Sequence, residues 1–230
     1  MEENLGEYNA EGSELRKLQL KMLEILTVVT DIADKHGIPY WLSGGTLLGA
    51  ARHGGFIPWD DDIDIELLRP DLLKLQKILK TELPSDLYLQ TPEDEGYRLL
   101  FSKVRDRNSI VREEDDELDR YDEKGVYIDL FPEERSYLWM KRIVDFFYGR
   151  AYRRLKRGQA LRSFRFFYEY MLSLVLYPIG FVLMWLARAI CALTRPNNIL
   201  HSYGIGNTTN HNASYMFPVG KVKRSPHQRI

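Results

Sequence analysis

The stretch GGFIPWDDDIDIELL, residues 54–68, decides how the first half of the chain should fold. Four aspartates crowd into five positions of it, after a Pro-Trp pair and before an apolar run. From Asp62 onwards polar and apolar residues alternate, which is typical of a β-strand. A period of two places Asp62, Asp64 and Glu66 on one face of that strand and the apolar residues between them on the other.

Carboxylates this close repel one another unless a cation lies between them. Magnesium prefers oxygen ligands, and manganese accepts the same set, so Asp62 and Asp64 predict a site for Mg²⁺, with Mn²⁺ as the alternative. The segment VYIDLF, residues 126–131, predicts a second strand on which Asp129 shares a face with Tyr127. Three carboxylates on two neighbouring strands favour metal-dependent phosphoryl transfer.

A glycine turn precedes the acidic stretch. IPYWLSGG, residues 38–45, predicts a strand that runs into Gly44 and Gly45, whose backbone N–H groups can approach a phosphate closely. Residues 46–53 predict a short helix that Thr46 helps to cap, and Thr46 is, with Gly44 and Gly45, a candidate contact for substrate. Ser13 can cap a helix at 14–36, and Pro70 starts another. With the further strands, this order predicts an α+β fold: a small mixed sheet flanked by helices.

Four basic residues are candidate contacts for a donor phosphate. Arg52 and His53 lie between the glycine turn and the aspartates, whereas Lys103 and Arg105 alternate on a predicted strand. Arginine suits bidentate phosphate contacts. Two alternatives stay open: Arg52 pairs with the aspartates, and the strand residues are ordinary charges that face solvent.

Other interpretations of the acidic run are weaker. A bare Asp-Asp-Asp run is usually a solvated loop. A calcium loop would use Asp60, Asp62 and Asp64, but Ile65 stands where that loop needs glycine and Asp71 where it needs glutamate.

The segment GGTLLGAA excludes a Walker ATPase, because Ala50 and Ala51 replace the required Lys and Ser or Thr.

Composition sets broader limits. The formal net charge is −1, which gives no global field for nucleic acid. The single cysteine, Cys191, forms no intramolecular disulfide, and the polar start of the chain carries no signal segment, so we expect a cytoplasmic protein. We expect a catalytic core at residues 1–135 and a helical appendage at 136–230, basic and then apolar.

The appendage contains eighteen uncharged residues, 170–187, after a strongly basic stretch at 141–165. We expect residues 141–187 to make a peripheral membrane contact, on the inner face of the membrane. A membrane span, a hairpin broken near Pro178 and Gly180 that dips into one leaflet, and a pair of buried helices remain alternatives.

The segment YWLSGGTLLGAARHGGFIPWDDDIDI, residues 40–65, resembles the signature of the LicD family of phosphocholine transferases, to which fukutin and fukutin-related protein are more distantly related. FSKVRDRNSIV and GVYIDLFP resemble the next blocks of that family. The resemblance covers residues 15–135 densely and implies a nucleotidyltransferase-like fold. It matches Gly44 and Gly45 to the family's turn, Asp62 and Asp64 to its paired acids, and Asp129 to its third acid.

The resemblance also implies the activity, which is transfer of a phospho-alcohol from a CDP-alcohol donor to a sugar hydroxyl, with release of CMP. The best-known donor is CDP-choline. The acceptor would be a cell-surface or lipid-linked glycan such as lipopolysaccharide or teichoic acid. The end of the chain, MFPVGKVKRSPHQRI, differs from the family's closing segment, so we expect a truncated or altered C-terminus. A catalytically silent membrane-associated binding protein and a true nucleotidyltransferase that uses a nucleoside triphosphate are the alternative functions.

Overall fold

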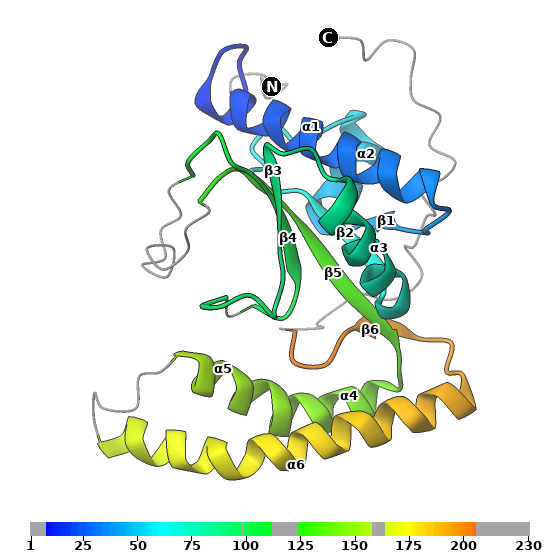
Figure 1. Ribbon diagram of the computed structural model, residues 1–230, viewed down its shortest axis with the longest axis vertical. Helices are drawn as coiled ribbons and strands as arrows, with labels where there is room; N and C mark the ends of the chain where they lie inside the picture. Colours follow the sequence, from blue (N-terminus) through cyan, green and yellow to red (C-terminus); the bar gives the residue numbers. More distant parts are fainter. Residues whose placement is uncertain (1–7, 98, 112–123, 158–163, 206–230) are drawn as a thin grey trace, which may run out of the picture. The chain divides into compact units, whose positions relative to one another are not determined.

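The computed structural model describes all residues except 1–7, 98, 112–123, 158–163 and 206–230 (Figure 1). The C-terminal segment that we expect to be truncated or altered therefore lies outside the described residues. The described chain forms two compact units. The first comprises the described parts of 1–90 and 103–130, and the second those of 91–102 and 131–215.

Three helices and most of the sheet belong to the first unit. Ser13 caps α1 by accepting a hydrogen bond from the Arg16 N–H at 3.1 Å, and Pro70 lies in the first turn of α3, as predicted. The helix after the glycine turn begins at Gly44 rather than at Thr46, with Ser43 as its N-cap. The bounds are α1 Glu14–Lys35, β1 Trp41–Leu42, α2 Gly44–His53, β2 Asp64–Leu68, α3 Arg69–Glu82, β3 Leu87–Gln90, β4 Ser102–Asp106 and β5 Tyr127–Arg135.

The six-stranded mixed sheet confirms the predicted fold class. Its order is β1-β2-β5-β4-β3, with β6 (Ile199–His201) paired to β5. β1 pairs with β2 and β3 pairs with β4, both antiparallel. The Asp129 N–H donates to the Ile63 carbonyl at 2.8 Å, which joins the two acid-bearing segments side by side.

The core of the first unit follows the predicted alternation. Ile63, Ile65 and Leu67 are buried with Ile128 and Leu130, and the apolar stripes of α1 and α3 pack against them. Figure 1 shows α1 and α3 on the same side of the sheet. Because one face of β2 and β5 is committed to this core, their acidic side chains must occupy the other face.

The second unit contains a helical hairpin. α4 (Leu138–Val144), the π-helical turn η3 (Asp145–Gly149) and α5 (Arg150–Arg157) follow one another directly. α6 (Phe164–Thr194) lies alongside all three (Figure 1). Of the described helices, α6 contains the one segment, Phe167–Thr194, that is long and apolar enough to cross a membrane.

The predicted break at Pro178 and Gly180 is wrong, because α6 runs through both residues. Gly180 marks a close approach of helices instead: a Cβ atom there would lie 2.4 Å from the Tyr148 nitrogen. The ring of Pro178 lies on the exposed side of the helix. A re-entrant hairpin within residues 170–187 is therefore excluded.

Candidate active site

The acidic site is built on β2 and on the segment that leads into it. The strand begins at Asp64, so Asp62 precedes it, and the predicted start at Asp62 is two residues early. Asp61 is exposed, whereas Asp60, Asp62 and Asp64 are partly buried. The aspartates are therefore alternately buried and exposed, as the strand pattern predicts. Asp60 is partly buried with Asp62 and Asp64, even though it lies outside the strand.

The glycine turn receives two of these carboxylates. A Cβ atom on Gly45 would lie 2.6 Å from the Asp60 Oδ2 atom, and one on Gly44 would lie 3.7 Å from the Asp64 Oδ2 atom. Only a residue without a side chain leaves room for Asp60 at Gly45, whereas Gly44 is favoured by its φ of +48°. Because Gly44 and Gly45 start α2, the carboxylates also lie at the positive end of that helix, which favours negative charge.

Thr46 helps to hold Asp64 beside the start of α2. Its hydroxyl accepts a hydrogen bond from the Asp64 backbone N–H at 2.9 Å, and the Ser43 N–H donates to the Asp64 carbonyl at 3.1 Å. The start of α2 is therefore tied to the start of β2 on both sides of Asp64. In this structure Thr46 positions an acid, while its predicted contact with substrate stays a prediction.

The pKa values show how crowded the carboxylates are. Burial, and then the charges of Asp62 and Asp129, raise the pKa of Asp64 to about 8. Burial, and then the charge of Asp62, raise the pKa of Asp60 to about 6, and burial also raises the pKa of Asp62. Such shifts arise where acids share a site with too little positive charge.

Asp129 is the third predicted acid, and it lies 9% exposed on β5. Its Oδ1 atom forms an ion pair with the Lys103 Nζ atom at 2.8 Å, and the same ammonium lies 3.4 Å from the centre of the Tyr127 ring. Burial raises the pKa of Asp129 to about 6, although Lys103 opposes the shift. The structure thus joins Asp129 and Lys103 on the site face of neighbouring strands.

Arg105 lies on β4 two residues beyond Lys103. It is 1% exposed, so it is not a charge that faces solvent. Its guanidinium donates to Gln90 Oε1 at 2.7 Å and to the Gly125 carbonyl at 3.1 Å, and it lies over the Tyr127 ring. These contacts hold β3, β4 and the start of β5 together, and contact of Arg105 with a donor phosphate stays a prediction.

Arg52 and His53 lie elsewhere on the same helix. Both are exposed in the last turn of α2, where basic residues complement the helix dipole. The helix rises by 1.5 Å per residue, so they lie roughly 13 Å along its axis from Gly44. The structure does not bring them beside the aspartates, and their contact with a donor phosphate stays a prediction.

Gln19 of α1 is a positioning residue that the sequence pattern did not indicate. It is fully buried, and its amide nitrogen donates to the Asp60 carbonyl at 2.9 Å and lies 3.5 Å from the Ile57 and Pro58 carbonyls. Its Oε1 atom accepts from the Asn9 amide at 3.1 Å. One side chain thus holds the loop that carries the first aspartate.

Replacing Gln19 with leucine should destabilise the protein by about 1–3 kcal/mol, because the buried carbonyl of Asp60 loses its donor. Urea unfolding measures this change. The matched control is Thr27→Val on the same helix, which removes an exposed hydrogen bond to the Leu23 carbonyl and should cost little. Equal midpoints for the two variants would contradict the positioning role.

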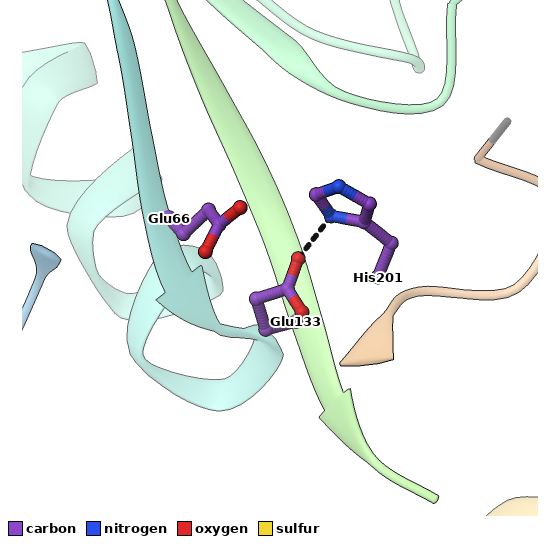
Figure 2. A group of neighbouring side chains, drawn as sticks. All are labelled: Glu66, Glu133 and His201. Atoms are coloured by element: carbon purple, nitrogen blue, oxygen red, sulfur yellow. Dashed lines mark hydrogen bonds and ion pairs between the residues drawn. The ribbon is translucent and has the colours of Figure 1, made fainter. Parts of the chain in front are cut away.

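Figure 2 draws a separate set of acidic and imidazole side chains. In the second unit, the Glu133 carboxylate pairs with the Nδ1 atom of His201. Glu66 belongs to the first unit, where the Trp41 indole donates to it at 2.5 Å and the Ser43 hydroxyl also donates to it. Carboxylates and imidazole are ligands for divalent cations, so Glu133 and His201, within the second unit, are further candidate ligands for a metal of unknown identity.

Comparisons with known proteins match the region that carries the acids. The model of the family described as LicD/FKTN/FKRP, nucleotidyltransferase domain, matches residues 37–159, which is more than half of the chain. That span includes the glycine turn, all four aspartates, Lys103 and Asp129.

Two kinds of relative are similar to part of this region. The lipopolysaccharide cholinephosphotransferase LicD of Haemophilus influenzae is 41% identical over 80 residues, which are 35% of this chain and 30% of that protein. The ribitol 5-phosphate transferase FKRP of mouse is 40% identical over 62 residues, 27% of this chain and 13% of that protein. The human FKRP has the same identity over 62 residues, covering 12% of its length. The matches thus span less than a third of each relative.

Proposed function

Because this chain belongs to the LicD/FKTN/FKRP nucleotidyltransferase-domain family, we propose that it transfers a phospho-alcohol from a CDP-alcohol to a sugar hydroxyl of a cell-surface glycan. The specific form of the proposal is phosphocholine from CDP-choline, with lipopolysaccharide or teichoic acid as acceptor. The similar bacterial protein is named for transfer of choline phosphate and the similar mammalian one for transfer of ribitol 5-phosphate. Both names describe a phosphorylated alcohol as the group that moves.

The observation that carries the proposal is the packing of acids against the glycine turn. Asp60 packs closely on Gly45, Asp64 lies in van der Waals contact with Gly44, and the charges of Asp62 and Asp129 act on Asp64. Acids confined in this way, next to a helix N-terminus, fit a site that binds a diphosphate through a divalent cation.

The residues of the acidic site fit magnesium. Every candidate donor in this site is a carboxylate oxygen, which a hard cation prefers, and the buried Oδ2 atom of Asp60 has no hydrogen-bond partner among the described residues. Asp62, Asp64 and Asp129 would hold the ion. Bound there, Mg²⁺ or Mn²⁺ would neutralise charge on the diphosphate of the donor.

The reaction exchanges one P–O bond for another. The acceptor hydroxyl oxygen bonds to the phosphorus that carries the alcohol, and the bond from that phosphorus to the bridging oxygen breaks. CMP leaves with the electron pair of that bond. Asp129, as a ligand of the ion or as a base, would help to activate the acceptor hydroxyl and so favour transfer of its proton. Lys103, paired with Asp129, holds that carboxylate in place and adds positive charge to the site.

The test is release of CMP by the purified chain. With CDP-choline, Mg²⁺ and a glycan extract, we expect CMP to form, together with a gain of one phosphocholine in the mass of the glycan. A chelator should stop both, and the variant Asp61→Asn should not, because Asp61 is exposed.

The other outcomes identify the alternatives. CMP release with CDP-ribitol but not with CDP-choline would keep the reaction type and change the alcohol. Pyrophosphate release from a nucleoside triphosphate would favour nucleotidyl transfer instead. Binding of donor without any turnover would favour a catalytically silent protein of this fold.

A further inference from the structure

We propose that the helical hairpin of the second unit binds an anionic lipid bilayer through the outer face of α6, with the two helices lying in the plane of the membrane interface. This inference rests on observations that are separate from the acidic site. Of the alternatives for residues 170–187, which are a membrane span, a re-entrant hairpin, a buried helix pair and a contact with the membrane surface, the contacts of α6 favour the last.

One narrow face of α6 is used for packing inside the unit. The residues buried on this helix are spaced by seven, four, three and four positions, which places them on one side of an α-helix. That side packs against α4, η3 and α5. Its members are Ser173, Gly180, Met184, Ala187 and Cys191.

Most of the other side chains that the structure describes on α6 are exposed and apolar. At 100° per residue the exposed ones between 167 and 194 cover about half of the circumference of the helix, and none of these is charged. Exposed apolar patches of this extent are rare on proteins that meet only water. The larger members are Phe167, Tyr168, Met171, Leu172, Leu174, Val175, Ile179, Phe181, Val182, Trp185, Leu186, Ile190 and Leu193.

The width of this surface favours a bilayer over a second protein helix. A partner helix typically buries a stripe of about 100°, which would leave much of the arc in water. Lipid contacts the whole arc at once. The aromatic residues Phe181 and Trp185 lie within it, and tryptophan is favoured at the level of the lipid headgroups.

The neighbouring helix carries the charge that an anionic surface would attract. Arg142, Arg150 and Arg153 are exposed along α4 to α5. The same helix exposes Trp139, 59% accessible, and Phe146, on which Arg150 stacks with its guanidinium carbon 5.2 Å from the ring centre. Basic residues beside apolar ones are typical of helices that lie in a membrane interface.

These same contacts argue against a helix that crosses the membrane. α6 packs lengthwise on α4, η3 and α5, so a span would carry the exposed arginines of that partner into hydrocarbon. Near its ends α6 is also joined to charged partners: Glu169 pairs with Arg154 at 3.3 Å, and Arg188 pairs with Glu134 at 2.7 Å. Lying in the interface keeps these groups near water.

The experiment is co-sedimentation of the full chain with vesicles of phosphatidylcholine containing roughly one-third phosphatidylglycerol. We expect binding to these vesicles, weaker binding to pure phosphatidylcholine, and weaker binding at high salt. Because two apolar side chains leave the bilayer, the double variant Val182→Asp, Trp185→Asp should reduce partitioning by roughly tenfold or more. Arg142→Glu with Arg150→Glu should reduce it on anionic vesicles alone.

The controls change exposed residues of the same kinds elsewhere. Ile110→Asp removes an apolar side chain that is 80% exposed in the first unit, and Lys77→Glu reverses an exposed charge on α3. Neither should alter vesicle binding. If both controls reduced vesicle binding as much as the α6 and arginine variants do, the outer face of α6 would not be the membrane-binding surface.

Two further results would overturn the proposal. In the first, membranes are prepared from cells that produce the full chain and are washed at alkaline pH. A protein held at the interface is extracted by this wash, so retention of the chain would show a span. A stable dimer that Val182→Asp with Trp185→Asp dissociates, without any vesicle binding by the monomer, would assign the face to a second copy of the chain.

Discussion

Replacing Asp64 with asparagine is expected to reduce CMP release by about a thousandfold while the protein remains folded, and Asp62→Asn should do the same. The amide keeps the size of the side chain but removes the charge that a divalent cation needs. Asp64 is the acid most constrained by its surroundings: its N–H donates to Thr46, its carboxylate lies beside Gly44, and two other acids act on it.

Stability measured with and without Mg²⁺ separates this role from a merely structural one. Without divalent cations, Asp64→Asn should unfold at the same temperature as the unchanged protein or above it, because the variant loses a repulsive charge. Mg²⁺ should raise the unfolding temperature of the unchanged protein and not that of the variant. Asp61→Asn serves as control, and it should behave as the unchanged protein in both assays.

If the variant Asp64→Asn retained full activity, the acidic site would not be the active site, whatever the donor proved to be. Loss of activity together with an unchanged response to Mg²⁺ would point instead to a structural or substrate-binding role for Asp64.

The fold of the first unit could be predicted because its signals are local. Alternation at residues 62–68 and 126–130 separates the acids from Ile63, Ile65 and Ile128, and burial follows that separation. Ser13 and Pro70 mark helix starts through contacts within one turn. Such patterns need no knowledge of the partner across the sheet.

The details that were missed depend on residues distant in sequence. Gln19 reaches Asp60 across 41 positions, and Arg105 reaches Gly125 across 20. No spacing rule contains such contacts, so a buried glutamine on an amphipathic helix resembles any other polar residue. Strand alternation says nothing about Asp60, which precedes the strand, whereas packing against Gly45 places it with the other acids.

Pro178 shows the opposite error, a local rule that packing overrides. Proline removes a backbone donor and usually ends or kinks a helix. In α6 it lies on the exposed side, while Gly180 allows the opposite side to approach Tyr148 closely. The contacts along α4, η3 and α5 therefore hold one continuous helix.

Replacing Gly125 with alanine is expected to destabilise the protein by about 3 kcal/mol or more. A Cβ atom at this position would lie 1.5 Å from the Asp106 carbonyl oxygen, and that oxygen belongs to the backbone. No rotation of a side chain can relieve such a contact, so β4 or the start of β5 must move. The Asp106 N–H donates to the Val126 carbonyl at 2.8 Å, and Arg105 donates to the Gly125 carbonyl at 3.1 Å.

Gly37→Ala is the matched control for this variant. Gly37 has a φ of +61° and nothing within 4 Å of an added Cβ atom, so alanine there meets backbone strain but no clash. That strain costs about 1–2 kcal/mol. The free energy of unfolding measured in urea should therefore be highest for the unchanged protein, lower for Gly37→Ala and much lower for Gly125→Ala.

An equal loss of stability in the two variants would mean that β4 and β5 are not packed as closely as the structure shows. The site would then lose the support for Lys103 and Asp129, because these two residues sit on the same pair of strands.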